Sequence, residues 1–485
     1  MVLKKNKKTG ELSATVLQER FRHMSDFYQR SLITKFDQTY LLFFLQSLID
    51  TESLNRFIIL PLLDGIENGV VQNISSVELE PVTLLKEAEQ KILAGCVLII
   101  DNQTNQFWLA KIPNLISRSI ETSQQENILY GPKDSFTELV DQNITLIRRR
   151  LPLAQLKSEL FTIGSLSKTK VLLIYLEGII DPALVETARE KIKLTDYDIF
   201  LNTPELASFL EENKNSVFPQ SQISDRPDAT ASALASGKVA ILMDGTPFAL
   251  IAPITFFELF QSPQDYIHRW PVATFLRALR FFAFFIVLSL TPAYVAISTY
   301  HYEMIPLQIL VIITGSRSEI PLTPFWEALS MMLTVEILKE ASLRMPTKTA
   351  QTLGIVGGIV IGQAAVQSGL TSNTMVVSVA ISSIASFLVP NYLMTGSSKL
   401  LQYIFLGLAA IWGFLGIIIG FTWMCIHLNS LSSLNRSYIA PLSPWYTGDW
   451  KDTLVRLPIQ SLKTRPEYLK TLRDQRFESS QGDKT

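Results

Sequence analysis

The stretch "TLGIVGGIVIGQAAVQSGL", Thr352–Leu370, has the length of a membrane span but an unusual composition for one. It contains five glycines and two glutamines. Glycine weakens an isolated helix by about 1 kcal/mol relative to alanine, and a glutamine amide in hydrocarbon needs a hydrogen-bond partner or water. We therefore expect this glycine-rich helix to face protein or a pore, rather than lipid, on most of its sides.

The spacing of its residues separates two faces. At about 100° per residue, one side collects the small residues Gly354, Gly358, Gly362, Ala365 and Gly369. The other side carries Val356, Val360, Gln363 and Gln367. Because a stripe of small residues lets a neighbouring helix approach closely, the first side is predicted to be a helix-packing face.

The second face has the chemistry of a pore lining. If several copies surrounded an axis, it would present two amides one turn apart and a constriction of β-branched side chains, which can gate by dewetting. The sequence therefore predicts that Val356, Val360, Gln363 and Gln367 line or gate a pore. A packed span in which each glutamine bonds to a neighbouring helix fits the same residues, and this alternative stays open.

Charge divides the whole chain into two parts. The chain has 485 residues, a formal net charge of -1 and a positive mean hydropathy of +0.23, which is too apolar for an ordinary soluble enzyme. Between residues 349 and 435 the only formal charge is Lys399, whereas residues 1–270 mix charges throughout. We expect an α/β cytoplasmic N-terminal region of two similar subdomains, followed by an α-helical polytopic membrane domain. The N-terminus lacks the apolar core of a secretory signal, which favours a cytoplasmic N-terminal region.

The two subdomains are predicted from an internal duplication. "AGCVLIIDNQTNQFWLAKIP" (Ala94–Pro113) and "SGKVAILMDGTPFALIAPITF" (Ser236–Phe256) share the pattern of a β-hairpin. Upstream of each, "FIILPLLDGIENG" (Phe57–Gly69) and "VLLIYLEGIIDPALV" (Val171–Val185) are both predicted to contain a strand that ends in an acidic residue. A helix is predicted over Pro182–Lys193, with the proline in its first turn. Chance similarity between short hairpins is the alternative.

The predicted boundaries follow from these changes in pattern. We expect a flexible basic N-terminus over residues 1–30, α/β subdomains over 31–147 and 148–267, a helical membrane domain of four to six spans over 268–430, and a basic C-terminal tail over 431–485. The excess of Lys and Arg in the tail places it in the cytoplasm.

A second unusual helix is predicted over Leu322–Arg344, with Thr323 as its cap. Glu336, Glu340 and Arg344 recur every four residues on one of its faces, so this face cannot meet hydrocarbon. We predict that Glu336 and Glu340 line a wet vestibule that favours cations. A surface helix with local pairing of Glu340 and Arg344 is the alternative. Further apolar stretches cover residues 352–371, 374–395, with a kink near Pro390, and 400–427.

The sequence contains no motif that is typical of a catalytic site. The four histidines are scattered, and Cys96 and Cys425 are the only cysteines, so the sequence predicts no metal site, no disulfide framework and no cofactor. Neither a phosphate-binding loop nor a nucleophile with its base is present, so we expect no enzyme. Two charged motifs stand out: "RPD" (Arg226–Asp228) is predicted to pair or cap locally, and "RRR" (Arg148–Arg150) is predicted to be a solvated helix end. For the second, contact with phosphate or lipid headgroups is the alternative.

Many short motifs together resemble the A subunit of the spore germinant receptors, the GerA family of endospore-forming bacteria. They occur in the family's order over about residues 90–447. These motifs are "GPKDSFTELVDQNITLIRRRL" (Gly131–Leu151), "YLEGIIDP" (Tyr175–Pro182), "FPQ" (Phe218–Gln220), "RPD", "VAILMDGTPFALIAP" (Val239–Pro253), "FFELFQSPQDY" (Phe256–Tyr266), the glycine-rich helix, "ASFLVPNY" (Ala385–Tyr392) and "YIAPLSPW" (Tyr438–Trp445).

The resemblance implies a function that spacing alone does not give. It implies a multi-pass subunit of the spore inner membrane, with a two-part cytoplasmic domain, that works with a transporter-like B subunit and a C-subunit lipoprotein. It also implies that copies form a homo-oligomer, a nutrient-gated channel for monovalent cations, with no nucleic acid as partner. A scaffold or signal-relay subunit for the B subunit, without a pore of its own, is the alternative.

Overall fold

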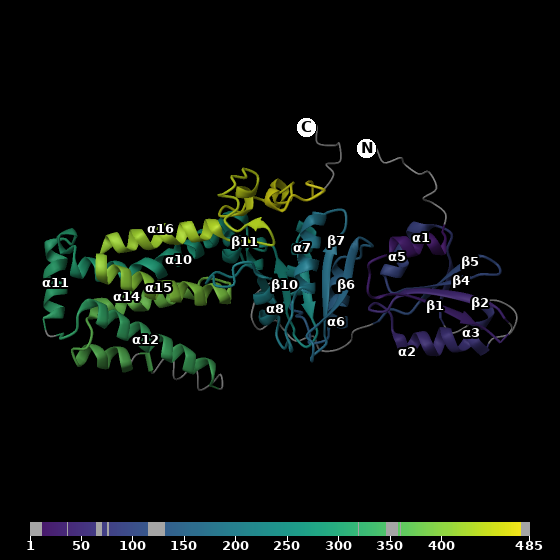
Figure 1. The fold of residues 1–485 in the computed structure, drawn as a ribbon, viewed down its shortest axis with the longest axis horizontal. Coiled ribbons are helices and arrows are strands. Elements are labelled where there is room, and N and C mark those ends of the chain that lie inside the picture. The colour runs from purple at the N-terminus through teal and green to yellow at the C-terminus, as the bar shows by residue number, and fades with distance from the viewer. Residues whose placement is uncertain are drawn as a thin grey trace.

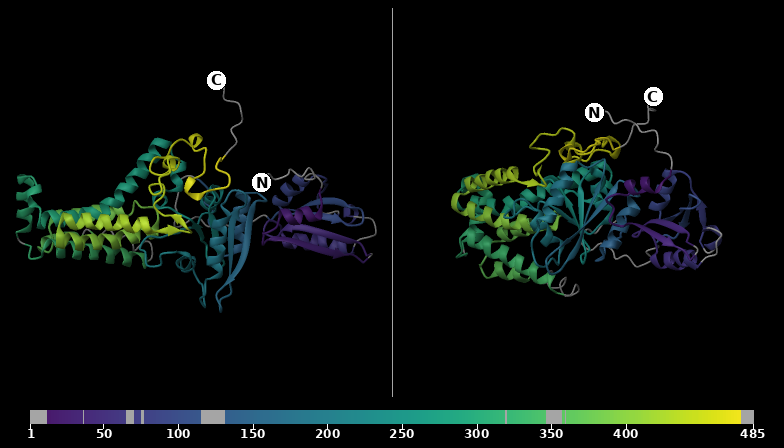
Figure 2. Two further views of the ribbon diagram at one scale, coloured as in Figure 1. Left: turned by 45° about the horizontal axis from the view of Figure 1, so that its top comes forward. Right: turned by 45° about the vertical axis from the view of Figure 1, so that its right-hand side comes forward.

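The computed structural model describes residues 12–35, 37–64, 70–74, 77–114, 131–318, 320–345, 357–358 and 360–476. These residues form an elongated molecule in which the first α/β subdomain, the second and a helical region follow one another along the long axis (Figure 1). The last part of the chain returns to lie over the second subdomain and the start of the helices, as Figure 2 shows from two further angles.

The first subdomain is a five-stranded antiparallel sheet in the order β1-β2-β4-β5-β3. Its strands are β1 (Phe27–Ile33), β2 (Thr39–Leu45), β3 (Leu79–Pro81), β4 (Cys96–Asp101) and β5 (Gln106–Lys111). The helices are α1 (Ala14–Arg20), α2 (Thr51–Leu54), α3 (Leu60–Asp64), α4 (Val70–Asn73) and α5 (Leu85–Leu93). Successive side chains of a strand point to opposite faces. Because α1 and α5 cover one face and α2 to α4 the other, β4 is buried along its whole length.

The second subdomain repeats this plan in the order β6-β7-β9-β10-β8. Its strands are β6 (Leu156–Ile163), β7 (Thr169–Leu176), β8 (Gln222–Ser224), β9 (Val239–Met243) and β10 (Ala249–Ala252). Helices α7 (Pro182–Lys193) and α8 (Thr203–Leu210) cover one face, and α6 (Val140–Arg150) and α9 (Pro227–Ser236) cover the other. The two sheets therefore have the same strand order, which is what a duplication produces.

The predicted hairpins occupy equivalent places, since β4–β5 and β9–β10 are the third and fourth strands of their sheets. The helix predicted over Pro182–Lys193 is confirmed as α7. The strand predicted over Phe57–Gly69 is wrong, because a π-helical turn (Asn55–Ile59) continues there into α3. Ile58 and Leu62, one helical turn apart, bury the same side of this segment. The true equivalent of β7 is β2, and residues 65–69 lie outside the described part of the chain.

Two predicted boundaries also need correction. Residues 14–30 are not a flexible N-terminus, because α1 and β1 form part of the first subdomain and Leu17 and Phe21 are buried in its core. Helix α6 packs on the second sheet through Val140, Ile144 and Ile147, so the second subdomain begins before residue 148. The predicted boundary fell at the arginines that end α6, although the apolar residues before them belong to the second subdomain.

The "RRR" motif joins the two subdomains. The Arg148 side chain is 1% exposed, and its Nε and Nη2 atoms donate to the two carboxylate oxygens of Asp26 at 2.7 and 2.6 Å. Burial alone would raise the pKa of the Asp26 carboxyl, but the Arg148 charge and hydrogen bonds from Arg148 and Ser47 hold it below its ordinary value. Arg150 pairs with Asp134, and Arg149 donates to the carbonyl of Asn114. Arg148 is therefore an interdomain clasp, neither a solvated helix end nor a headgroup contact.

The helical region contains α10 (Trp270–Thr299), α11 (Leu307–Arg317), α12 (Pro324–Leu343), α14 (Asn373–Ser386), α15 (Tyr392–Trp412) and α16 (Phe414–Ser430). Residues 357–358 and 360–367 of the glycine-rich helix are also helical. Thr323 occupies the predicted N-cap position of α12, and Pro324 begins the helix, but the Thr323 side chain makes no capping hydrogen bond. Among the described residues, one helix, α10, is long and apolar enough to cross a membrane by length and composition, while α14 and α16 are shorter apolar helices.

Two predicted stretches prove to be broken. Residues 374–395 are not one kinked helix, because α14 ends at Ser386 and Asn391 caps the new helix α15. Residues 400–427 divide at Gly413, whose positive φ of 57° turns α16 back along α15. A Cβ atom at Gly413 would lie 2.9 Å from the His301 Nε2 atom, so only glycine fits this turn. As a result α16 returns to the second subdomain, where His427 Nε2 lies 3.0 Å from Ser216 Oγ.

We expect replacement of Arg148 by methionine to cost about 3 to 5 kcal/mol in the free energy of unfolding, because it leaves the largely buried Asp26 carboxylate without its counter-charge. The measurement is chemical denaturation of a fragment of residues 1–265. Since the folded pKa of Asp26 is depressed, the loss should be largest at neutral pH and should shrink as the pH falls below about 4.

Lys35→Met is the matched control, because the Lys35–Asp64 pair has side chains 72% and 67% exposed. We expect this variant to change stability by less than about 1 kcal/mol. Equal losses in the two variants would show that Arg148 is no clasp.

Candidate functional site

The predicted pore face lies on the outside of the single chain. Val360 is 55% exposed, and Gln363 and Gln367 are exposed as well. Val356 lies outside the described residues. The structure of one chain therefore leaves this face available, and its pore-lining role stays a prediction.

The predicted packing face is partly occupied within the chain. A Cβ atom on Gly362 would lie 4.0 Å from a methyl carbon of Val376 on α14, and Ala365 packs against a buried cluster of α10, α12, α14 and α15. A Cβ atom on Gly358 would meet no described atom within 4 Å. Gly369 is half-buried at the end of the helix, and Gly354 lies outside the described residues. The helix therefore packs on its own chain at one end of this face and is open at Gly358.

The predicted vestibule residues both form ion pairs. Glu336 lies 3.1 Å from Lys399 of α15 and 3.8 Å from Lys339. Glu340 pairs with Arg344 at 2.7 Å, and both side chains are mostly exposed. The one charge in the long apolar part of the sequence, Lys399, is thus balanced by Glu336. The vestibule role of Glu336 and Glu340 stays a prediction.

A buried ion cluster fixes the start of α10. The Arg277 side chain is fully buried, and its Nε atom lies 3.2 Å from Asp265 Oδ2. Its Nη1 atom donates to the carbonyl and Oδ1 of Asp452 at 2.6 and 3.1 Å. Arg280, one turn further along α10, donates to Asp265 Oδ1 at 2.7 Å. We call Asp265, Arg277, Arg280 and Asp452 the clamp cluster, because it joins three parts of the chain: the segment after the second sheet, α10 and the C-terminal tail.

Tyr266 seals the clamp cluster. Its hydroxyl donates to Asp452 Oδ2 at 2.8 Å, and the guanidinium carbons of Arg277 and Arg456 lie 5.9 and 5.5 Å from the centre of its ring. Burial and the Asp452 charge raise the pKa of Tyr266. Burial also raises the pKa of Asp452, against the opposing effect of Arg277 and the Tyr266 hydroxyl. Tyr266 is nevertheless 42% exposed and the Asp452 side chain 26% exposed, so only the inner pair of the cluster, Asp265 and Arg277, is cut off from water.

The tail also holds the second subdomain. After the short hairpin of β11 (Ser432–Ser433) and β12 (Arg436–Ser437), the Tyr438 hydroxyl donates to the Pro219 carbonyl at 2.7 Å, and Phe256 donates its backbone N–H to the Tyr438 carbonyl at 2.7 Å. Further along, Arg465 Nε donates at 2.8 Å to the Ala235 carbonyl near the end of α9. The tail therefore ties the second subdomain to α10.

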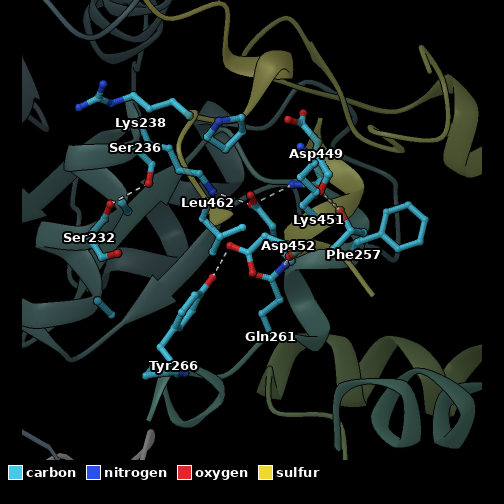
Figure 3. A pocket seen from close by; sticks show the side chains of 18 of the residues that line it. Ser232, Ser236, Lys238, Phe257, Gln261, Tyr266, Asp449, Lys451, Asp452 and Leu462 are labelled. Carbon is cyan, nitrogen blue, oxygen red and sulfur yellow. Dashed lines mark hydrogen bonds and ion pairs between the residues drawn. The ribbon is translucent and has the colours of Figure 1, made fainter. Parts of the chain in front are cut away.

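A cavity of about 650 Å³ lies where α9, the segment after β10 and the tail meet. Figure 3 shows Ser232 and Ser236 of α9 on one wall, Gln261 and Tyr266 on another, and Lys451, Asp452 and Leu462 of the tail. Two of its charged groups, Lys238 and Glu258, pair with each other. Lys238 Nζ lies 2.6 Å from Glu258, which also accepts the Tyr468 hydroxyl. The cavity walls are therefore held together by internal bonds.

The clamp cluster was missed in the sequence, although its parts were visible. The basic stretch from His268 to Arg280 had the pattern of a membrane flank, and "SPQD" (Ser262–Asp265) has the pattern of a capped turn. Only the fold shows that two of the arginines meet the aspartate of that turn and a second aspartate more than 170 residues away.

These features define a class of protein in which a duplicated antiparallel α/β region is clamped to a helical region with one long apolar helix. The chain belongs to the Bacillus/Clostridium GerA spore germination protein family, which matches residues 15–468. This membership confirms the resemblance seen in the motifs.

Individual relatives are similar over most of their length. The chain is 36% identical to spore germination protein GerQA of Bacillus cereus over 401 residues, which cover 82% of this chain and 80% of that protein. It is also 36% identical to spore germination protein KA of Bacillus subtilis over 432 residues, which cover 87% and 79% of the two chains. A crystal structure of the N-terminal domain of the A subunit of the Bacillus megaterium spore germinant receptor GerK3 matches with 23% identity and a TM-score of 0.39, over 50% of this chain and 93% of that one.

We expect Asp265→Asn to remove about 3 to 5 kcal/mol of stability, because two buried guanidinium groups lose their shared carboxylate. The measurement is the melting of the full-length protein in detergent, together with its steady-state amount in the membrane. Asp474→Asn, in an exposed part of the tail, is the control and should behave like the wild type. Normal melting of Asp265→Asn would show that the clamp cluster contributes little to the junction.

Proposed function

We propose that the chain is a membrane subunit of a nutrient receptor that starts spore germination, and that copies of it assemble into a nutrient-gated channel for monovalent cations. Membership of the GerA family and the names of its relatives support the role in germination. The channel is a further step, supported by the glycine-rich helix.

The observation that carries the channel is the asymmetry of this helix. One side packs on its own chain near Gly362 and Ala365, whereas the side with Val360, Gln363 and Gln367 is exposed. Amide groups that faced hydrocarbon would lose their hydrogen bonds at a cost of several kcal/mol. A water-filled axis shared by several copies satisfies the amides, and Val360 then supplies the apolar constriction.

Gly358 supports the assembly. It is exposed, and a side chain there would meet no described atom of its own chain. A glycine is unnecessary at such a position unless another backbone approaches it closely. We assign that approach to the same helix of a neighbouring copy.

The clamp cluster supplies a route from the cytoplasmic region to this helix. A movement of the second subdomain or the tail acts on the first turns of α10 through Arg277 and Asp452. Helix α10 in turn contacts the turn after the glycine-rich helix, where the Tyr294 and Ser372 hydroxyls lie 3.2 Å apart. Rigid helices joined by such contacts can transmit a two-state change.

The receptor context follows from the family. We propose that the chain lies in the spore inner membrane with several crossings and a cytoplasmic N-terminal region, and that it works with a transporter-like B subunit and a C-subunit lipoprotein. The contact of α16 with Ser216 supports placing the tail on the same side as the α/β region. We propose no enzymatic reaction and no cofactor.

A scaffold without a pore is the second candidate. One observation favours it: the Glu336 charge is balanced by Lys399 within the chain, so it supplies no net negative charge to a vestibule. A scaffold of this kind would relay the signal of the B subunit through α10 alone.

We expect Val360→Ala to widen and wet the constriction, so that cells that express the receptor leak potassium and dye without nutrient. Gln363→Leu should dry the pore and abolish nutrient-triggered ion release. Gly358→Leu should instead reduce assembly and receptor amount, because a branched side chain fills the space for the neighbouring helix.

Val377→Ala is the matched control for the leak, since Val377 of α14 is 56% exposed and loses the same two methyl groups. Cells that express this variant should leak neither potassium nor dye without nutrient. If Val360→Ala and Val377→Ala behave alike, with no leak from either, the face of Val360 does not line the pore.

A further inference from the structure

Glu327 is a buried carboxylate in the helical region that the proposed channel does not use. It lies in the first turn of α12 and is fully buried. Its Oε1 atom accepts hydrogen bonds from the backbone N–H and hydroxyl of Ser372, each at 2.6 Å, and from the Thr371 hydroxyl at 3.2 Å. Because Ser372 caps α14, Glu327 fixes the joint between α12 and the start of α14.

The second oxygen of this carboxylate has no partner. Within the described part of the chain, no group donates a hydrogen bond to Glu327 Oε2, although the atom is buried. The ion pairs that α12 makes there join Glu336 to Lys339 and Lys399, and Glu340 to Arg344, so none reaches Glu327. The positive N-terminal end of α14 offsets part of the charge on the Oε1 side. A buried carboxylate that lacks a full counter-charge is costly.

Other buried oxygens along the same seam also lack partners. Helices α10 and α14 touch at Tyr294 and Ser372 near one end, and at Val287 and Ser382 further along. Between these contacts lie Thr291 Oγ1 on α10 and Ser378 Oγ on α14, both buried and without a partner among the described residues. Both oxygens belong to the α10–α14 interface that also holds Ser372, a hydrogen-bond donor to Glu327, and oxygen atoms are the usual ligands of a hard cation.

We propose that Glu327 binds one monovalent alkali cation in the seam between α10, α12 and α14. A single carboxylate balances one positive charge, and the described residues contain no group of three or more His, Cys, Asp or Glu side chains that would suit a divalent metal. The glycine-rich helix ends just before Thr371, so the negative end of its dipole points toward the same place. Serine and threonine oxygens of the seam complete the coordination.

Such a cation would lock the turn between the glycine-rich helix and α14. With the cation bound, the carboxylate holds both Thr371 and Ser372 against α12. Without the cation, the Glu327 carboxylate has no counter-charge, and the cost of keeping it buried favours opening of this joint. The inference concerns the stability of the single chain and does not depend on the presence of a pore.

The test is the melting of the purified full-length protein in detergent, in sodium chloride, potassium chloride or N-methyl-D-glucamine chloride at one ionic strength and pH 7.5. We expect sodium or potassium to raise the melting temperature by about 2 to 4 °C at ten times its dissociation constant, with saturation. In Glu327→Gln, which keeps the acceptor oxygen but not the charge, the melting temperature should be the same in all three salts. Glu340→Gln, at an exposed ion pair, should keep the response of the wild type.

Thr291→Val provides a second variant, because it removes one seam oxygen and leaves the carboxylate. It should shift the saturation of the response to higher cation concentration. A wild type that melts alike in the three salts would overturn the proposal, as would an equal response in wild type and Glu327→Gln. If the melting of the wild type depends on pH but not on the cation, Oε2 carries a proton and the cation site is wrong.

Discussion

A guanidinium group that is wholly cut off from water must be paired, and Arg277 imposes this requirement on the junction of the molecule. Its partners come from the segment after the second sheet and from the C-terminal tail, so the charge can be buried only when all three parts are in place. The start of α10 is thereby fixed against the second subdomain. The contact of α16 with Ser216 fixes the helical region to the second subdomain at another point.

The remaining charges of the helical region follow the same rule. Lys399, in the long apolar part of the chain, has its charge balanced by Glu336, which lies 3.1 Å away. Glu327 differs from Glu336 because it has no ion pair among the described residues: one of its oxygens accepts hydrogen bonds and the other accepts none. Paired charges therefore hold the helices together, whereas the Glu327 carboxylate, which has no counter-charge, lies beside the turn that follows the glycine-rich helix.

How much of this could be predicted from sequence depended on the range of the interactions. Local patterns sufficed for the hairpins β4–β5 and β9–β10, for α7 and for the start of α12, since turn residues and caps act over a few residues. The segment around Ile58 was mistaken for a strand, because a short apolar run has no distinct period. The division at Gly413 was missed, because the tight space around it is set by His301, which lies in the loop after α10, more than 100 residues earlier in the chain.

The candidate site divides in the same way. The two faces of the glycine-rich helix follow from helical geometry, and the exposure of Val360 and Gln363 agrees with the spacing. The clamp cluster and the Arg148 clasp depend on residues separated by more than 100 positions, and no pattern within one segment indicates which charges will meet. Long-range pairing of charges is the part of this fold that a single sequence does not reveal.

The central claim is that this chain forms a cation-conducting pore through the face of Val360, Gln363 and Gln367. Recording from planar bilayers that contain the purified full-length protein alone tests it most directly. The account predicts discrete currents that are selective for monovalent cations over anions and that disappear when Gln363 is replaced by leucine. Bilayers that stay silent at protein densities where oligomers are detected would contradict the claim and leave the chain as a relay for its partner subunits.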